Sequence, residues 1–468
     1  MTMTDRARSI FLGALAFGVV AFDGAAARAQ TPPAPPVPLV DTRPSNALTL
    51  RRCLELATRH YPRIQEALAK ARASRADIDV AHYAPYTNFS VTGVVAPAPR
   101  VSGTSQFSRS PDEEQGLDLG VAWRVGIEGM IPLWTFGKIT NAWDVAEAGA
   151  KAAEHAVQKE KNDLRLAVRH AYFAAQAARD SLLIVHDEMA NLDRYVPALE
   201  QKVLSRDADE IDLMKLRMER AELEAREAEV RLQESKALAG LGFLTGLGGK
   251  VAVSGEPLTR ARHELGPLLR YLTAARLHRP EVNMVRAGIL AQEAHVRLER
   301  ANYFPDFGIG VNARYQQTPE RPDDRNPYTS GYQDQLGYGA GLVLRYKADF
   351  LPQGARVARA EAELEAIRAS ERFALGSVGV EVEEAFREAE TAKRRLDAWT
   401  RASELAERWL NQVEQRIEAG TLDEKDVLEP TREVARKRFG RLAAILEYNL
   451  ALAKLAQATG WEQGITDE

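Results

Sequence analysis

The stretch LDLGVAWRVGIEGMI, residues 117–131, decides the fold. Its apolar and polar side chains alternate, so they fall on opposite faces of an extended strand. The apolar face holds Leu117, Leu119, Val121, Trp123, Val125, Ile127 and Ile131, and the other holds Asp118, Gly120, Arg124, Gly126 and Glu128. About ten residues suffice for a tilted strand to cross a bilayer. We therefore predict a transmembrane strand with Val121, Trp123 and Val125 facing lipid.

The same alternation recurs in three other segments: near 87–96, at 306–316 and at 335–347. Soluble strands alternate too, but here the pattern is confined to two pairs of strands that long polar helices separate. In the last strand Leu342 lies on the apolar face, glycines predominate on the other, and Val343 interrupts the pattern. Two long loops rich in Pro, Ser and Asp, 97–116 and 317–334, join the strands of each pair, as is typical of outer-membrane strands.

The N-terminal residues 1–29 have the features of a secretory signal peptide. Two arginines precede an apolar core, 10–22, that is too short to anchor the chain, and Ala27–Ala29 offers small residues for cleavage. Residues 30–46 form a Pro-rich linker. No later run of 18 apolar residues predicts a membrane helix.

An internal duplication organises the rest of the chain. The segment that begins at His60 matches the one that begins at His278: each has a proline near a helix start, a helix of about twenty residues, an aromatic-proline break and a strand. The tripeptide LTG at 244–246 corresponds to ATG at 458–460. We predict two structural repeats, each with a helix, two strands and a long helical hairpin: 47–262 and 263–468.

The helical segments carry a seven-residue repeat. From Leu164 to Val203, apolar or small residues recur in steps of alternately four and three, and 396–417 keeps the same rhythm. A helix over about 137–203 would be about 100 Å long at 1.5 Å per residue, so it must belong to a rod or tube. An ordinary coiled-coil stalk would explain these helices, but it would not explain the strands.

Four strands cannot close a membrane barrel, because open strand edges are not tolerated in lipid and the smallest barrels have about eight strands. Several chains must therefore share one barrel. Two chains would supply about eight strands around a filled interior, and three would supply about twelve around a water-filled lumen.

At this point the chain resembles the TolC-like outer-membrane efflux proteins. The resemblance covers about 47–460 and rests on the duplicated layout together with four local features: Tyr61-Pro62, Arg279-Pro280, the strand exit Ile131-Pro132-Leu133-Trp134, and the turn EAGTLDEKDVLEP at 418–430. It implies a mainly helical fold with transmembrane strands, in which a homotrimer forms a twelve-stranded barrel that continues into a periplasmic helical coiled-coil barrel. It further implies a periplasmic adaptor (membrane fusion protein) and an inner-membrane pump as partners, an outer-membrane lipid environment, no catalytic role and no cofactor.

The resemblance also points to residues at the periplasmic mouth. The family's acidic step corresponds to Asp426-Val427-Leu428-Glu429, so that Asp426 and Glu429 would form a pore constriction together with Asp212. The alternative is that Asp423 and Asp426 only cap a helix start.

At the hairpin tips the expected adaptor contacts are Arg206, Asp207, Gly420 and Thr421. Arg206 replaces the usual turn glycine. The family's gate Arg and Tyr positions are Leu422 and Ile417, so the sequence does not support that salt-bridge lock.

Other function classes find little support. A net charge of −4 leaves no positive surplus for nucleic acid. The eight histidines are scattered without a metal motif, and the only cysteine, Cys53, is interpreted as a small buried residue. The glycine-rich run 246–250 lacks the spacing of a phosphate loop and is interpreted as a turn.

Two functions of different class remain. One is a passive exit duct of a tripartite efflux or type I secretion system, served by a proton-driven or an ATP-driven pump. The other is a surface-anchored adhesive coiled-coil protein. The duct is favoured because the strands occur twice in mid-chain and both chain ends lie with the helices.

Overall fold

The computed structural model describes residues 47–86, 88–103, 113–206, 209–248, 251–317, 335–462 and 465. The predicted signal peptide and linker lie outside the described residues, as do Asp207 and the loop residues 104–112 and 318–334.

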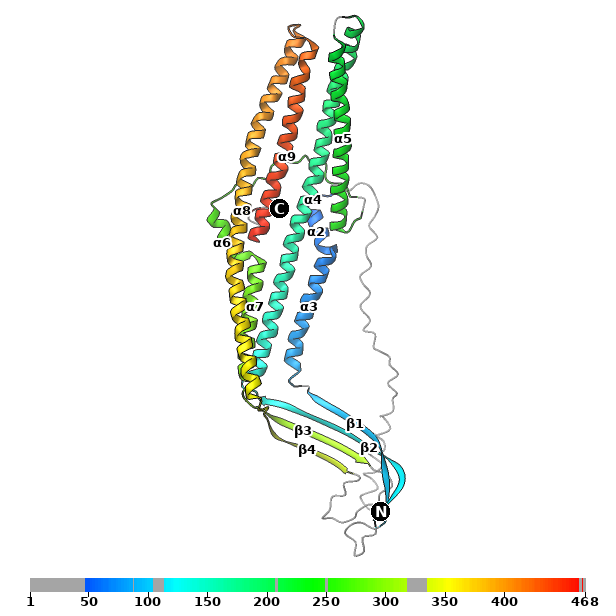
Figure 1. Cartoon of the computed structure of the whole chain (residues 1–468), viewed down its shortest axis with the longest axis vertical. Helices are drawn as coiled ribbons and strands as arrows, with labels where there is room; N and C mark the ends of the chain where they lie inside the picture. Colours follow the sequence, from blue (N-terminus) through cyan, green and yellow to red (C-terminus); the bar gives the residue numbers. More distant parts are fainter. Residues whose placement is uncertain are drawn as a thin grey trace. The chain divides into compact units, whose positions relative to one another are not determined.

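The four strands form one antiparallel sheet in the order β1-β2-β3-β4 (Figure 1). Their bounds are β1 Phe89–Gly103, β2 Glu113–Trp134, β3 Asp306–Gln317 and β4 Gln335–Arg345. All four predicted strands are confirmed, but the predicted loop 97–116 is too long, because pairing continues from Pro97 opposite Val121 to Gly103 opposite Glu113. Proline lacks an N–H, and an edge strand such as β1 tolerates this because one side of its backbone pairs with no other strand among the described residues.

The helices of the two halves correspond in order and length. The first half contains α2 Leu50–His60, α3 Pro62–Tyr83, α4 Lys138–Leu204 and α5 Glu210–Thr245. The second contains α6 Leu268–His278, α7 Pro280–Ala301, α8 Phe350–Glu418, the short 3-10 helix η1 Glu424–Val427 and α9 Leu428–Thr459. The predicted helix over 137–203 is confirmed by α4, whose 67 residues match the 69 of α8. Pro62 and Pro280 occupy the first turn of α3 and α7, where no intrahelical N–H is needed.

The second helix of each hairpin, α5 and α9, ends at a glycine cap. Gly246 after α5 and Gly460 after α9 have φ angles of 75° and 66°, in the left-handed region that glycine reaches without strain. A side chain at Gly246 would meet His60, and one at Gly460 would meet the carbonyl of His278. The caps therefore pack against the two histidines that begin the duplicated segments.

The helices pack in pairs along buried small and apolar residues. α4 packs against α5, and α8 packs against α9, where Gly440 leaves room for the ring of Trp399. Cys53 is fully buried in a cluster between α2, α4 and α5, as predicted, and burial raises the pKa of its thiol to about 12. Such a thiol stays protonated and unreactive.

Candidate pore surfaces and hairpin ends

The two faces of the sheet differ in chemistry. Residues directly opposite one another share a face, and one such row holds Ser90, Glu128, Asn312 and Gly339. The Ser90 hydroxyl lies 3.3 Å from a Glu128 carboxylate oxygen and donates to it. A hollow of about 570 Å³ lies over this polar face, and all four residues line it. The sheet therefore leaves open space on the face that the sequence predicts to line a lumen.

The other face is apolar and exposed in the single chain. Leu342 lies in a row with Ile131 and Ile309, and its side chain is 85% exposed. Val121 and Val125 are also exposed, whereas Trp123 is half-buried because its ring contacts Tyr315 at 5.2 Å between centroids. Exposed aliphatic side chains on one face are what contact with lipid requires, so this face stays the predicted lipid surface.

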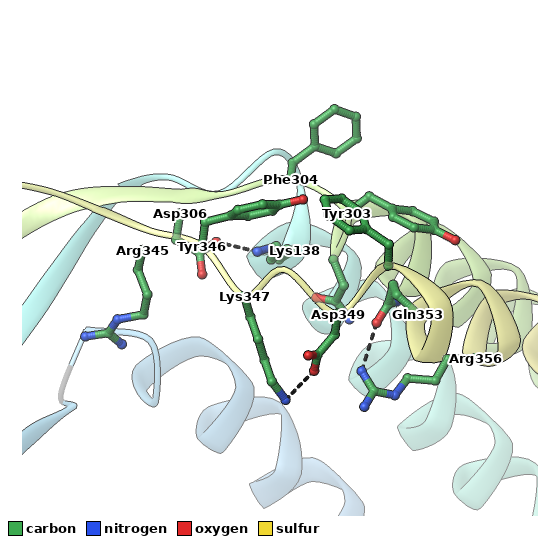
Figure 2. A pocket seen from close by; sticks show the side chains of 12 residues that line it. Lys138, Tyr303, Phe304, Asp306, Arg345, Tyr346, Lys347, Asp349, Gln353 and Arg356 are labelled. Carbon is green, nitrogen blue, oxygen red and sulfur yellow. Dashed lines mark hydrogen bonds and ion pairs between the residues drawn. The ribbon is translucent and has the colours of Figure 1, made fainter.

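A second cavity, of about 280 Å³, lies where the strands meet the long helices (Figure 2). Two ion pairs line it, Lys138 with Asp306 and Lys347 with Asp349, each with 2.8 Å between nitrogen and oxygen. Asp306 pairs in register with Arg345, two steps along from Gly308, so both belong to the polar face.

Aromatic side chains gather beside this junction. The rings of Phe136 and Phe304 stack with centroids 5.0 Å apart, and Trp134 and Phe307 pack against Phe136. In Figure 2 the Phe304 ring points away from the charged side chains that line the cavity. Aromatic rings at the end of membrane strands are typical of an interfacial girdle.

The hairpin turns have matching backbones despite different residues. Arg206 after α4 and Gly420 after α8 have φ angles of 65° and 69°. The arginine at the usual glycine position therefore keeps the left-handed turn instead of changing it. Thr421 completes the second turn, since its N–H and its hydroxyl both donate to the carbonyl of Arg416, at 2.8 and 2.9 Å. These tip residues lie at the ends of the hairpins; their contact with an adaptor stays a prediction.

The acidic residues predicted for the mouth lie on both hairpins and have local partners. The Asp426 carboxylate accepts the Asp423 N–H at 3.1 Å, and the Asp426 N–H donates to the Asp423 carbonyl. The first of these bonds is one half of a capping box, in which the side chain three residues into the helix accepts the N–H of the residue that precedes it, so Asp426 does cap the start of η1. Glu429 is exposed in the first turn of α9. Asp212, in the first turn of α5, pairs with Lys215 on its own helix at 3.0 Å.

A cluster of charges joins the two hairpins. The guanidinium of Arg432 on α9 contacts two carboxylates of α5, Glu219 at 3.1 Å and Glu222 at 3.7 Å. Nearby on α4, Glu188 is only 6% exposed. Burial, and then the charge of Glu219, raises the pKa of Glu188 to about 7, while Arg438 on α9 opposes the shift.

Sequence reasoning missed Glu188, although a signal existed. It lies three residues after Val185 and four before Leu192, the spacing that places side chains on one face of a helix, and both of these neighbours are buried. A carboxylate at such a position is expensive to bury without a partner.

Two kinds of site are absent from the described part of the chain. No group of three or more His, Cys, Asp or Glu side chains there could hold a metal ion. Among the helices described, none is both long enough and apolar enough to cross a membrane.

Comparison with known proteins places the chain in a family. The model of the outer membrane efflux protein family matches residues 53–247 and 271–461. The protein CyaE of Bordetella pertussis is 25% identical over 379 residues, which are 76% of this chain and 76% of CyaE.

Solved structures share the fold. The outer-membrane channel OprN is 20% identical with a TM-score of 0.68, and the alignment covers 88% of this chain and 89% of OprN. The open state of the MtrE outer membrane channel of Neisseria gonorrhoeae is 16% identical with a TM-score of 0.68 and 90% coverage of both chains.

The chain belongs to the outer membrane efflux protein family. The predicted resemblance, fold class and location are thereby confirmed: the protein has the fold of trimeric TolC-like channels and is located in the outer membrane, with helices that extend into the periplasm.

Proposed function

We propose that three copies of this chain form the exit duct of a tripartite efflux or type I secretion system. One observation carries the proposal: among the described residues, the four-stranded sheet has an exposed apolar face, a polar face with a hollow over it, and two edges that pair with no further strand. Three such sheets joined edge to edge satisfy every backbone group in lipid and enclose a polar lumen. The long hairpins then extend the passage into the periplasm.

The duct is passive in this proposal. An inner-membrane pump supplies the energy, and a periplasmic adaptor contacts the hairpin tips around Arg206, Asp207, Gly420 and Thr421. The turns at Arg206 and Gly420 have the same left-handed backbone conformation. This similarity supports a partner that contacts both hairpins of each protomer in the same way.

Asp426 and Glu429 form the proposed constriction at the mouth, with Asp212 on the first hairpin. Three-fold symmetry would bring about six carboxylates from Asp426 and Glu429 alone to a narrow opening, where they concentrate cations and offer oxygen ligands to polyvalent ones. Capping and pore lining are compatible, because a carboxylate that accepts one N–H keeps further lone pairs.

Reconstitution in planar bilayers tests the proposal. We expect cation-selective single channels that polyvalent cations block from the periplasmic side, at about 10⁻⁶ to 10⁻³ M. The double variant Asp426→Asn, Glu429→Gln should lose the block while the trimer stays intact, because Asn keeps the capping oxygen. Unchanged block would return these residues to the capping role alone. A purified protein that stays a folded monomer in native mass spectrometry would contradict the duct itself.

A further inference from the structure

The cavity at the strand-to-helix junction carries an excess of positive charge. Four cationic side chains line it, Lys138, Arg345, Lys347 and Arg356, against the two carboxylates of Asp306 and Asp349. Each carboxylate is matched by one lysine in the ion pairs described above. The two guanidinium groups therefore remain as the uncompensated charges of the cavity wall.

These two arginines differ in how they are held. Among the described residues the side chain of Arg345 has no ion pair or hydrogen bond, and Figure 2 shows it at the strand end of the cavity. Arg356 is oriented by Gln353, whose side-chain oxygen accepts from its guanidinium at 2.9 Å. Gln353 is itself only 4% exposed, and its amide donates to the backbone and carboxylate oxygens of Glu299 at 2.7 and 2.8 Å. One guanidinium is thus preoriented by a buried amide, and, among the described residues, the other keeps all its donors available to a ligand.

The surroundings strengthen the attraction for an anion. Tyr303, Tyr346 and Phe350 line the same cavity, and the rings of Tyr346 and Phe350 lie 6.0 Å apart. Aromatic walls lower the local dielectric constant, so the arginines attract a bound anion more strongly than they would in open water. The planar guanidinium fork matches the two oxygens of a carboxylate or phosphate.

We propose that this junction cavity is an oxyanion-binding site that takes the carboxylate or phosphate group of an anionic solute within the duct. The lumenal position rests on the proposed function, because Arg345 and Asp306 belong to the polar face of the sheet and Arg345 also lines the larger hollow over that face. A volume of about 280 Å³ accommodates a small polyanion such as citrate. Each protomer carries one site, and a trimer carries three.

The test is direct binding of citrate and of inorganic phosphate to the purified trimer, by isothermal titration in an uncharged detergent at constant ionic strength. We expect saturable binding of one anion per chain. Arg345→Gln and Arg356→Gln should each weaken it about tenfold, since each removes charge-assisted hydrogen bonds. Arg345→Lys, which keeps the charge but not the fork, should fall between the wild type and Arg345→Gln.

Arg314→Gln is the matched control. Arg314 lies on the same polar face of β3, it does not line the junction cavity, and its loss removes the same charge. If Arg314→Gln weakens anion binding as much as Arg345→Gln does, the binding reflects the overall charge of the lumen, and the proposed site is overturned. Absence of saturable binding, or unchanged binding in both Arg345→Gln and Arg356→Gln trimers, would overturn it as well.

A lipid phosphate is the other source of the same chemistry, and native mass spectrometry of the trimer separates the two. Anionic phospholipid that is retained by the wild type and lost from Arg345→Gln, with no binding of citrate or phosphate, would overturn the lumenal assignment. Binding is measured without current, so a trimer that conducts but binds no anion contradicts only this inference. A trimer that binds anions and does not conduct contradicts the proposed duct.

Discussion

Glu188 makes the stability of the hairpin pair depend on pH. Its carboxyl group is buried on α4 and faces Glu219 on α5 and Arg438 on α9, with Asp187 beside it on its own helix. Arg438 is shared with Glu407, at 2.9 Å, and gives Glu188 only partial compensation. The folded chain therefore disfavours the ionised form of Glu188.

The sign and size of the effect on stability follow from the pKa of Glu188, about 7 in the folded chain against an ordinary value of 4.5. Because the folded pKa is raised, stability is fully present below the unfolded value and is lost as the pH rises through about 7. Ionisation of Glu188 therefore lowers the free energy of unfolding by about 3 kcal/mol per protomer at pH 8 and by less than about 1 kcal/mol at pH 5.

Glu188→Gln keeps the shape of the side chain and cannot ionise. We expect this variant to raise the thermal unfolding temperature of the trimer at pH 8 and to leave it nearly unchanged at pH 5, as followed by the helical circular dichroism signal. Asp187→Asn is the control, since Asp187 is exposed next to it and should cause little change at either pH. An equal shift at both pH values, or destabilisation by Glu188→Gln at pH 8, would refute the burial argument.

Two further substitutions test the turns and the sheet. Arg206→Gly should stabilise the first hairpin by about 0.5–1 kcal/mol, because a left-handed backbone costs a non-glycine residue about 1–2 kcal/mol and the greater entropy of glycine in the unfolded chain offsets part of the gain. Gly420→Ala should lower stability at the corresponding turn. The thermal unfolding temperatures of the two variants test both expectations. Leu342→Arg should cost about 2–4 kcal/mol if this side chain meets lipid near mid-membrane, whereas Gly341→Arg, on the opposite face with open space around it, should leave trimer yield intact and lower conductance. Equal trimer yields for these two arginine variants would show that the strand faces are assigned wrongly.

Most of the fold could be predicted because its signals are local and repeated. Alternation with a period of two specifies which side chains of β2 share a face wherever the strand pairs. The seven-residue repeat from Leu164 to Val203 ends within one residue of the end of α4 at Leu204. The predicted ends of the strands were less accurate. Pairing past Pro97 depends on whether β1 is an edge of the sheet, which its own residues do not encode.

The features of the candidate site also differ in how far they could be predicted from the sequence. The sequence by itself determined the polar and apolar faces of the strands, because the alternation lies in neighbouring residues. The positions of the hairpin turns and of the acidic step at Asp426 and Glu429 came from the resemblance to the family, and the pore role of that step stays a prediction. Only the tertiary structure decided that Glu188 is buried and that Arg345 and Arg356 line one cavity. The pKa of Glu188 depends on its burial and on charges distant in the sequence, Glu219 on α5 and Arg438 on α9, the latter 250 positions away. Long-range packing of this kind, rather than local pattern, sets the dielectric environment and the partners of a charge.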